Sequence, residues 1–99
     1  MEKQQALEVV AKYRVMLLTT RRANGGIILN RDFPHHIKVS NRTQILGHCL
    51  GMLDKMEEFL EEGETDKFMR WLGFIQGCFW ATRVYTLDEM KDDNRPRKE

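Results

Sequence analysis

The chain has 99 residues and a mass of 11.7 kDa, which leaves room for one compact domain and excludes a multidomain machine. Apolar residues make up 41% of it and there are only two prolines, so it can bury a core rather than belong to the disordered class. Its net charge of +1 is not the strongly basic balance of a histone-like nucleic-acid binder.

The first predicted element is a helix over residues 2–22, in which apolar residues recur at steps of three and four and which ends before Asn24-Gly25-Gly26. An alternative is open at its end, because residues 15–20 are compatible with a strand and could form a hairpin with residues 27–29. We favour the helix, since an isolated strand pair is only marginally stable in water.

Residues 24–39 are predicted to be a long connection, because they contain a glycine pair, Pro34 and no sustained apolar period. Connections longer than about 12 residues in compact domains are commonly functional. We therefore expect this segment to take part in function.

A second helix is predicted over residues 41–62, capped by Ser40 or Asn41 and ended by Gly63. A third follows over residues 66–84 and makes an antiparallel hairpin with the second.

The last element is a short helix that begins at Leu87, because Thr86 and Glu89 match the capping box. The predicted fold class is therefore all-α, a helical hairpin with an N-terminal helix and a short C-terminal helix. We expect one domain over residues 1–94 and a flexible polar tail over residues 95–99.

Paired glycines recur in both helices of the predicted hairpin. In an antiparallel register centred on residue 62, Gly47 faces Gly77 and Gly51 faces Gly73. The same register places Asp54 opposite Arg70 and Glu57 opposite Lys67. Glycines at four-residue spacing let two helix backbones approach closely, which predicts tight packing between the two helices. The alternative is that one glycine pair accommodates another subunit or a ligand.

Six of the nine aromatic residues fall in or just after the third helix and cover more than one of its faces. A domain of this size has few helices to cover such a helix, so we expect a homo-oligomer in which this helix contributes to the interface. The predicted packing or interface residues are Gly47, Gly51, Gly73, Gly77, Trp71, Phe74, Phe79 and Trp80.

The charge is strongly divided along the chain. Residues 12–42 carry seven cations and one anion, and residues 54–66 carry seven anions and one cation. A basic block can receive phosphates or an acidic protein surface. The predicted ligand- or partner-binding residues are Arg21, Arg22, Arg31, His35, His36, Lys38 and Arg42. Nucleic acid is a less favoured ligand, because the block has few interleaved aromatics and no known nucleic-acid motif.

Catalytic and metal-binding signals are weak. Neither CxxC nor a third ligand beside His35 and His36 is present, so we expect no metal and no cofactor. The pairs Glu58/Glu61 and Glu89/Asp92 resemble the acidic helix motif of MazG-like nucleoside triphosphate pyrophosphatases, where four carboxylates hold magnesium on phosphates. The predicted hairpin separates the two pairs, so this enzyme is an alternative rather than the favoured reading.

Cys49 and Cys78 lie in apolar periodic segments and are predicted to be buried thiols. No apolar run reaches the roughly 18 residues needed to cross a bilayer, and the N-terminus has no continuous apolar signal region. We therefore expect a reduced, cytoplasmic protein without a membrane partner.

Residues 70–77, Trp80 and residues 85–95 resemble small uncharacterised accessory proteins of tailed bacteriophages. This resemblance covers the C-terminal third and implies expression in the bacterial host, with no catalytic residues carried over. Phage proteins of this size often inhibit host or defence proteins, or form oligomeric sponges that sequester nucleotide signals. The favoured hypothesis is thus a non-enzymatic homo-oligomer that modulates a host or antiviral-defence component; the alternative is a sponge that holds a nucleotide in the basic loop.

Overall fold

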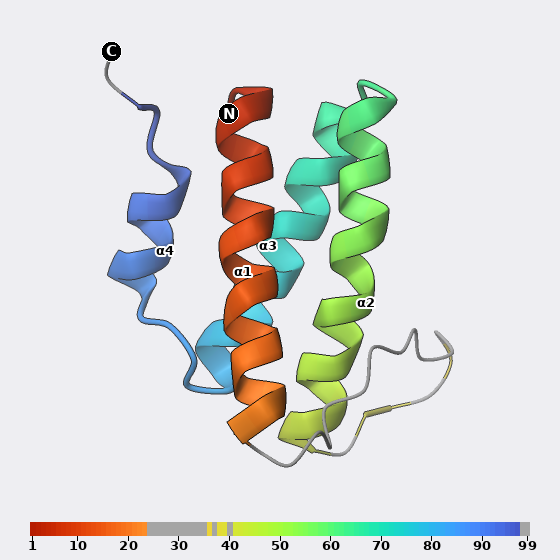
Figure 1. Cartoon of the computed structure of the whole chain (residues 1–99), viewed down its shortest axis with the longest axis vertical. Coiled ribbons are helices and arrows are strands. Elements are labelled where there is room, and N and C mark those ends of the chain that lie inside the picture. The colour runs from red at the N-terminus through yellow and green to blue at the C-terminus, as the bar shows by residue number, and fades with distance from the viewer. Residues whose placement is uncertain (24–35, 37, 40, 98–99) are drawn as a thin grey trace.

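The computed structural model describes residues 1–23, 36, 38–39 and 41–97, and these residues form helices without any strand (Figure 1). The helices are α1 (Lys3–Ala23), α2 (Arg42–Glu61), α3 (Thr65–Ala81) and α4 (Leu87–Asn94). The predicted all-α class is therefore confirmed. Residues 15–20 are helical within α1, so the strand alternative is wrong for them; its proposed partners, residues 27–29, lie outside the described residues.

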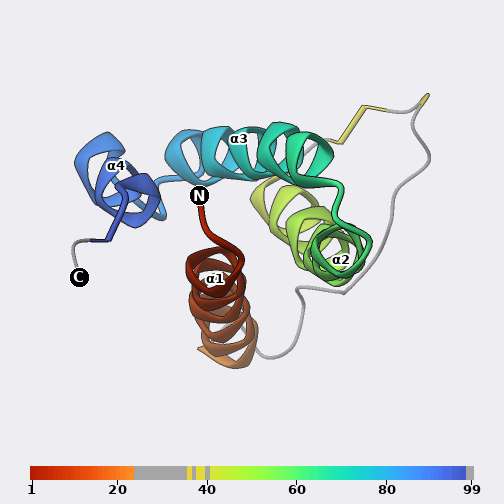
Figure 2. The ribbon, with the colours of Figure 1, turned by 90° about the horizontal axis from the view of Figure 1, so that it is seen from above.

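The four helices form two layers. Helices α1 and α2 run side by side in opposite directions, and α3 lies across one face of this pair, as seen from above in Figure 2. Helix α4 lies beside α1, on the side away from α2. Gly63 makes the turn between α2 and α3 with a φ of 74°, a left-handed conformation that glycine adopts without steric cost.

The core lies where α1, α2 and α3 meet. Each helix contributes apolar side chains at steps of three and four residues, which puts them on one face. An aromatic cluster closes one end of this core: Phe79 stands edge-on to Tyr13 at 5.0 Å and to Tyr85 at 5.9 Å between ring centroids. The fully buried members include Val9, Val10, Tyr13, Leu17, Leu46, Leu53, Met56, Phe68, Leu72, Ile75 and Phe79.

The start of α4 is the predicted capping box. The Thr86 hydroxyl accepts a hydrogen bond from the Glu89 backbone N–H at 3.1 Å, and the Glu89 carboxylate accepts one from the Thr86 N–H at 3.1 Å. This exchange satisfies two backbone donors that a helix start leaves unpaired. It explains how a helix of only eight residues begins at Leu87.

Polar contacts rather than a broad apolar face hold α4 against the other helices, since Met90 is its one buried apolar side chain. The Asp93 carboxylate accepts hydrogen bonds from Lys12 Nζ at 2.6 Å and from the Tyr13 hydroxyl at 2.8 Å. Gln5 Nε2 donates to the Asp93 carbonyl oxygen at 2.8 Å. We call Gln5, Lys12, Tyr13, Gln76, Asp93 and Asn94 the polar clasp.

Helix α3 joins the polar clasp through Gln76. Its side-chain amide donates to the Tyr13 hydroxyl at 2.9 Å and to Asn94 Oδ1 at 2.8 Å, and Asn94 Nδ2 donates back to Gln76 Oε1 at 3.0 Å. Among the described residues, no buried side-chain nitrogen or oxygen lacks a partner. The clasp therefore satisfies its buried polar groups while tying α4 to both α1 and α3.

The clasp makes the stability sensitive to alkaline pH. Burial raises the pKa of Tyr13 well above its ordinary value, Gln76 opposes that shift through its hydrogen bond, and Asp93 adds to it. Because the neutral phenol is favoured in the folded state, its contribution is complete below the unfolded pKa of about 10 and is lost as the pH rises further. We expect the free energy of unfolding to fall above about pH 10, less steeply in Tyr13→Phe, when measured by urea unfolding.

The C-terminal residues that follow α4 are exposed through residue 97. Arg95 pairs with Asp92 at 2.7 Å and Arg97 with Glu8 at 3.5 Å, both at the surface. Residues 98–99 lie outside the described residues, and the flexible tail stays a prediction. Each described helix is too short or too polar to cross a membrane.

Candidate functional site

The fold places Arg21, Arg22 and Arg42 toward one end of the molecule, whose longest dimension is 40 Å, and the turn between α2 and α3 toward the other, while Arg14 of the basic block pairs with Asp54 and Glu57 of the acidic block (Figure 1). The C-terminal end of α1 and the N-terminal end of α2 lie at the same end of the molecule (Figure 1). Arg21 and Arg22 belong to the last turn of α1, and Arg42 is the first residue of α2. We call this the basic end.

The predicted binding residues of the basic block are placed only in part. His36 and Lys38 are exposed. Arg42 Nε donates a hydrogen bond to the Thr82 carbonyl oxygen at 3.1 Å, which ties the start of α2 to the end of α3. Arg31 and His35 lie outside the described residues. The end of α1 and the start of α2, on either side of the long connection, therefore both lie at the basic end. Binding by the residues of the basic block stays a prediction.

The opposite, acidic end contains the turn between α2 and α3. Arg14 on α1 binds Asp54 at 2.8 Å and also Glu57, and Lys3 pairs with Glu61 at 3.5 Å. The hairpin register that sets Asp54 opposite Arg70 and Glu57 opposite Lys67 stays a prediction; Asp54 and Arg70 both line a groove between α2 and α3. Asp54 and Glu57 lie three residues apart on α2, where both reach α1, and a single guanidinium can bind two carboxylates.

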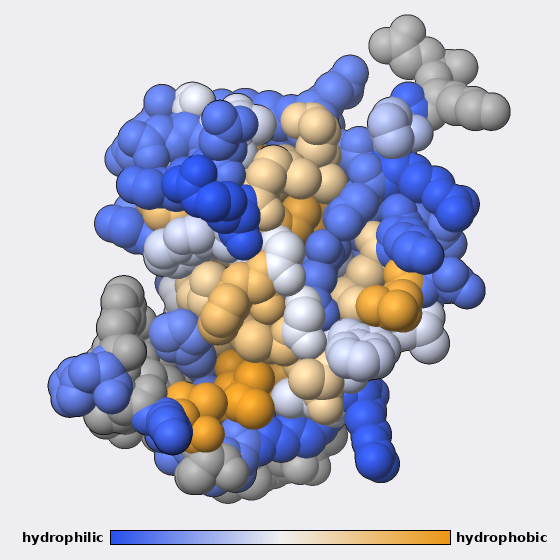
Figure 3. Space-filling model, turned by 180° about the vertical axis from the view of Figure 1, so that it is seen from behind, coloured by the Kyte–Doolittle hydropathy of each residue, from blue (hydrophilic) through white to orange (hydrophobic). Residues whose placement is uncertain are grey.

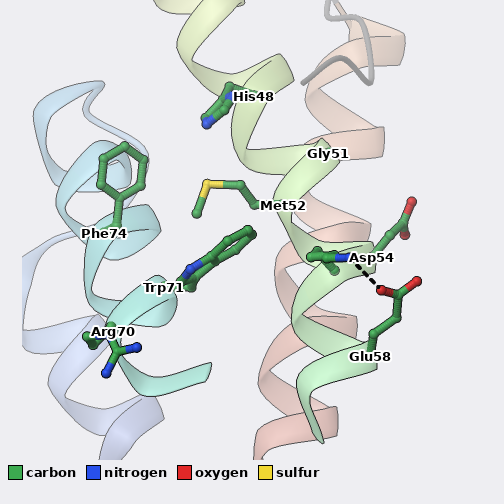
Figure 4. Close-up of a pocket in the computed structure, with 9 residues that line it drawn as sticks. His48, Gly51, Met52, Asp54, Glu58, Arg70, Trp71 and Phe74 are labelled. Carbon is green, nitrogen blue, oxygen red and sulfur yellow. Dashed lines mark ion pairs between the residues drawn. The ribbon is translucent and has the colours of Figure 1, made fainter. Parts of the chain in front are cut away.

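A groove with a volume of about 790 Å³ lies between α2 and α3 (Figure 4). The His48 and Phe74 rings stand edge-on across it, with centroids 6.3 Å apart. Its volume falls within the range of small-molecule sites. The lining residues are His48, Gly51, Met52, Asp54, Lys55, Glu58, Arg70, Trp71 and Phe74.

The charges of this groove suit a protein side chain better than a polyphosphate. Asp54 and Glu58 line it together with Lys55 and Arg70, and Lys55 pairs with Glu58 at 3.2 Å. The two carboxylates would repel a phosphate chain. Sequence analysis missed this groove, although the steps of three and four residues that join His48, Gly51 and Lys55 on α2 could have indicated a shared face.

The outer face of α3 carries large apolar side chains that no other described element covers. Phe74 is 55% exposed, Trp80 57% and Met69 37%. Figure 3 shows apolar surface running along the face of the molecule that α3 occupies. Apolar side chains gathered in this way on one surface are typical of an interaction site.

Two of the paired glycines lie on this outer face rather than between the helices of the hairpin. Gly73 and Gly77 are exposed, and a Cβ atom added to either would meet nothing within 4 Å. The predicted close approach between α2 and α3 is therefore wrong at these positions. The physical reason is that Phe68, Leu72, Ile75 and Phe79 form the buried face of α3, and the glycines lie on the opposite side. Gly47 is buried and Gly51 half-buried on α2.

Phe79 has the packing role of the two that were predicted for it, because the structure buries it completely. Its neighbour Trp80 points the other way and is exposed. Trp71 is half-buried, edge-on to Phe59 with ring centroids 4.8 Å apart. Of the aromatic residues predicted for an interface, Phe74 and Trp80 are the ones whose side chains are mainly exposed.

The carboxylates of the pyrophosphatase alternative are not brought together. Glu58 and Glu61 are on α2 and Glu89 and Asp92 on α4, and these helices lie on opposite sides of α1 (Figures 1 and 2). Glu58 and Glu61 pair with lysines, Glu89 caps α4, and Asp92 pairs with Arg95. Within the described residues, no group of three histidine, cysteine or acidic side chains is arranged to hold a metal ion.

The two thiols lie against each other across α2 and α3 with different exposure. The hydrogen bond that the Cys49 S–H donates to Cys78, together with burial, raises the pKa of Cys49, whereas accepting that bond lowers the pKa of Cys78. Because thiolates are the reactive form, we expect a maleimide to label Cys78 first in the folded protein. Mass spectrometry should find fast single labelling in Cys49→Ser and slow labelling in Cys78→Ser; equal rates would contradict the expectation.

Comparison with known proteins identifies no relative, since no family model, no curated protein and no solved structure matches the chain. The resemblance to phage accessory proteins stays a prediction.

Proposed function

We propose that the protein acts by binding rather than by catalysis, and that its basic end receives an acidic surface of a host or antiviral-defence protein. The observation that carries this proposal is the separation of charge by the fold. Arg21, Arg22 and Arg42 come from two helix ends that meet at one end of the molecule, far from the acidic turn between α2 and α3.

Separated charge supports recognition of a charged partner because complementary potentials steer the encounter and orient the two proteins. The acidic end would repel an acidic partner, which leaves the basic end as the side of approach. His36 and Lys38 are exposed just before α2 and add donors there. The setting, a phage protein inside its bacterial host, comes from the sequence resemblance alone.

A nucleotide signal is the competing ligand for the same basic end, since phosphates and acidic protein surfaces are attracted by the same cations. The two ligands can be distinguished by testing whether the purified protein carries a bound nucleotide. A bound nucleotide would be released on denaturation and seen by its absorbance and mass, and adding it would raise the melting temperature.

The proposal is tested with a charge-reversed pair of variants. Arg22→Glu/Lys38→Glu changes the basic end, and Lys91→Glu/Arg97→Glu makes the same change of charge at exposed residues of α4 and the tail. Each tagged protein captures partners from bacterial lysate, and the recovered partner is then measured by titration at increasing salt. We expect a stoichiometric protein whose affinity falls at least tenfold for the first variant and with rising salt, but not for the control.

Three results would overturn the proposal. One is a partner that binds the basic-end variant and the control equally, and another is the absence of any stoichiometric protein from the lysate. The third is a nucleotide released from the purified protein and lost with Arg22→Glu/Lys38→Glu, which would establish the sponge instead. Both variants should show the helical circular dichroism of the unchanged protein.

A further inference from the structure

We propose that the outer face of α3 binds a second copy of this chain, with the two α3 helices antiparallel about a two-fold axis near residue 75. This surface is separate from the basic end and does not depend on the function proposed for it. The observations behind it are the exposed aromatics of α3, the order of residues along the helix, and the charges at its two ends.

The face is mainly apolar, although a surface helix is ordinarily polar, and Arg70 is a charged residue within it. Phe74, Trp80 and Met69 are all more than a third exposed, and Gly73 and Gly77 lie between them with open space above. A single α-helix presents one face to its own core, which leaves these side chains largely uncovered; Phe74 meets the His48 ring of α2. Glycines at their centre leave the helix backbone open to close approach by another helix.

The residues of α3 are arranged so that two copies of the helix match each other when they run in opposite directions. Gly73 and Gly77 lie two residues on either side of residue 75, so an antiparallel second copy sets each glycine against the other. Met69 lies six residues before residue 75 and Trp80 five residues after it. Because an α-helix turns by 100° per residue, both side chains lie on the same edge of the face. Each Trp80 therefore meets Met69 of the second copy, a sulfur–aromatic contact made twice.

Phe74 lies on the other edge of the face, one residue from the proposed axis. Two-fold symmetry brings it beside Phe74 of the second copy, where aromatic rings attract each other edge-on or offset. It also lines the α2–α3 groove with His48 and Trp71 (Figure 4). The groove of one copy therefore has room for the Phe74 ring of the other.

The charges at the ends of α3 favour the antiparallel arrangement. Asp66 lies in the first turn and Arg83 just beyond the last, nine and eight residues from the axis, and both are exposed. An antiparallel copy sets Asp66 against Arg83 twice, whereas a parallel copy would set like charges together. The helix dipoles of two antiparallel helices attract each other and also favour this arrangement.

The first test is the mass of the full chain in solution. Sedimentation velocity from 2 to 200 µM should show conversion of the 11.7 kDa monomer to a species of twice that mass. Gly77→Leu should raise the dissociation constant at least tenfold, because its side chain holds the two helices apart. Gly77→Ala should keep the dimer, and Lys91→Leu, which puts the same side chain on exposed α4, should leave the constant unchanged.

The second test is the orientation of the pair. Asp66→Arg or Arg83→Asp alone should weaken the dimer, and the double variant should restore it. Under mild oxidation, Phe74→Cys should give a covalent dimer across the axis. Arg83→Cys should not, since the two copies of that position lie about 24 Å apart along the helices at 1.5 Å per residue.

A monomer at 200 µM would overturn the proposal, as would a dimer that tolerates Gly77→Leu. Covalent dimers from Arg83→Cys but not from Phe74→Cys would overturn the antiparallel register. The outcomes at Gly77 and Phe74 do not bear on the basic end, because both residues lie outside it; Arg83 adjoins it, since it follows Thr82, whose carbonyl oxygen accepts from Arg42.

Discussion

Replacing Phe79 by alanine is expected to lower the free energy of unfolding by about 3–5 kcal/mol, whereas Trp80→Ala should change it by less than about 0.5 kcal/mol. The two residues are adjacent aromatics on α3 and differ in which side of the helix they occupy. Phe79 is completely buried against Tyr13 and Tyr85, so its removal leaves a cavity in the core. Trp80 is 57% exposed, and its removal takes little surface out of the core.

Urea unfolding followed by circular dichroism measures both effects at protein concentrations below those of the proposed dimer. A loss near 4 kcal/mol is a large part of the 5–15 kcal/mol that folded domains have, so at the lower end of that range Phe79→Ala would keep only about 1 kcal/mol of stability. Equal losses in the two variants would mean that the outer face of α3 is also packed against the core.

Asp93→Ala is expected to cost about 2–3 kcal/mol, and its neighbour Asp92→Ala less than about 0.5 kcal/mol. Asp93 is buried in the polar clasp, and its loss leaves Lys12 and the Tyr13 hydroxyl without their acceptor. Lys12 is half-exposed and can turn to water, which keeps the cost below that of a fully buried ion pair. Asp92 pairs with Arg95 at the surface.

The loss at Asp93 should be concentrated in α4, because that helix has little apolar packing of its own. Hydrogen exchange followed by mass spectrometry should show faster exchange over residues 87–94 in Asp93→Ala than in Asp92→Ala, with α2 and the first turns of α3 less affected. Uniform acceleration over all four helices would show instead that the clasp supports the whole fold as one cooperative unit.

Local patterns predicted the helices well. The capping box at Thr86 and Glu89 placed the start of α4, and Asn41, one of two predicted caps, accepts from the Gln44 N–H at 2.9 Å at the start of α2. These signals act over three or four residues and need no tertiary partner, so the sequence shows them directly. Gly63 marked the end of α2 for the same reason.

Long-range contacts could not be predicted in this way. The polar clasp joins Lys12 and Tyr13 to Asp93, which lies 81 and 80 residues away, and nothing in the local pattern of either segment points to the other. The same holds for Arg14, which pairs with Asp54 and Glu57 at sequence separations of 40 and 43 residues. An ion pair depends on which helix packs alongside, and periodicity alone does not decide that.

The sequence by itself determined that the fold is all-α, that charge is divided between two blocks, and where the helices begin and end to within three residues. The third helix, predicted over residues 66–84, ends at Ala81. Only the tertiary structure decided which side of α3 faces the core. Because apolar residues surround that helix, periodicity allowed more than one buried face. Packing against α1 and α2 selected the side with Phe68, Ile75 and Phe79, and so left Gly73 and Gly77 in the open.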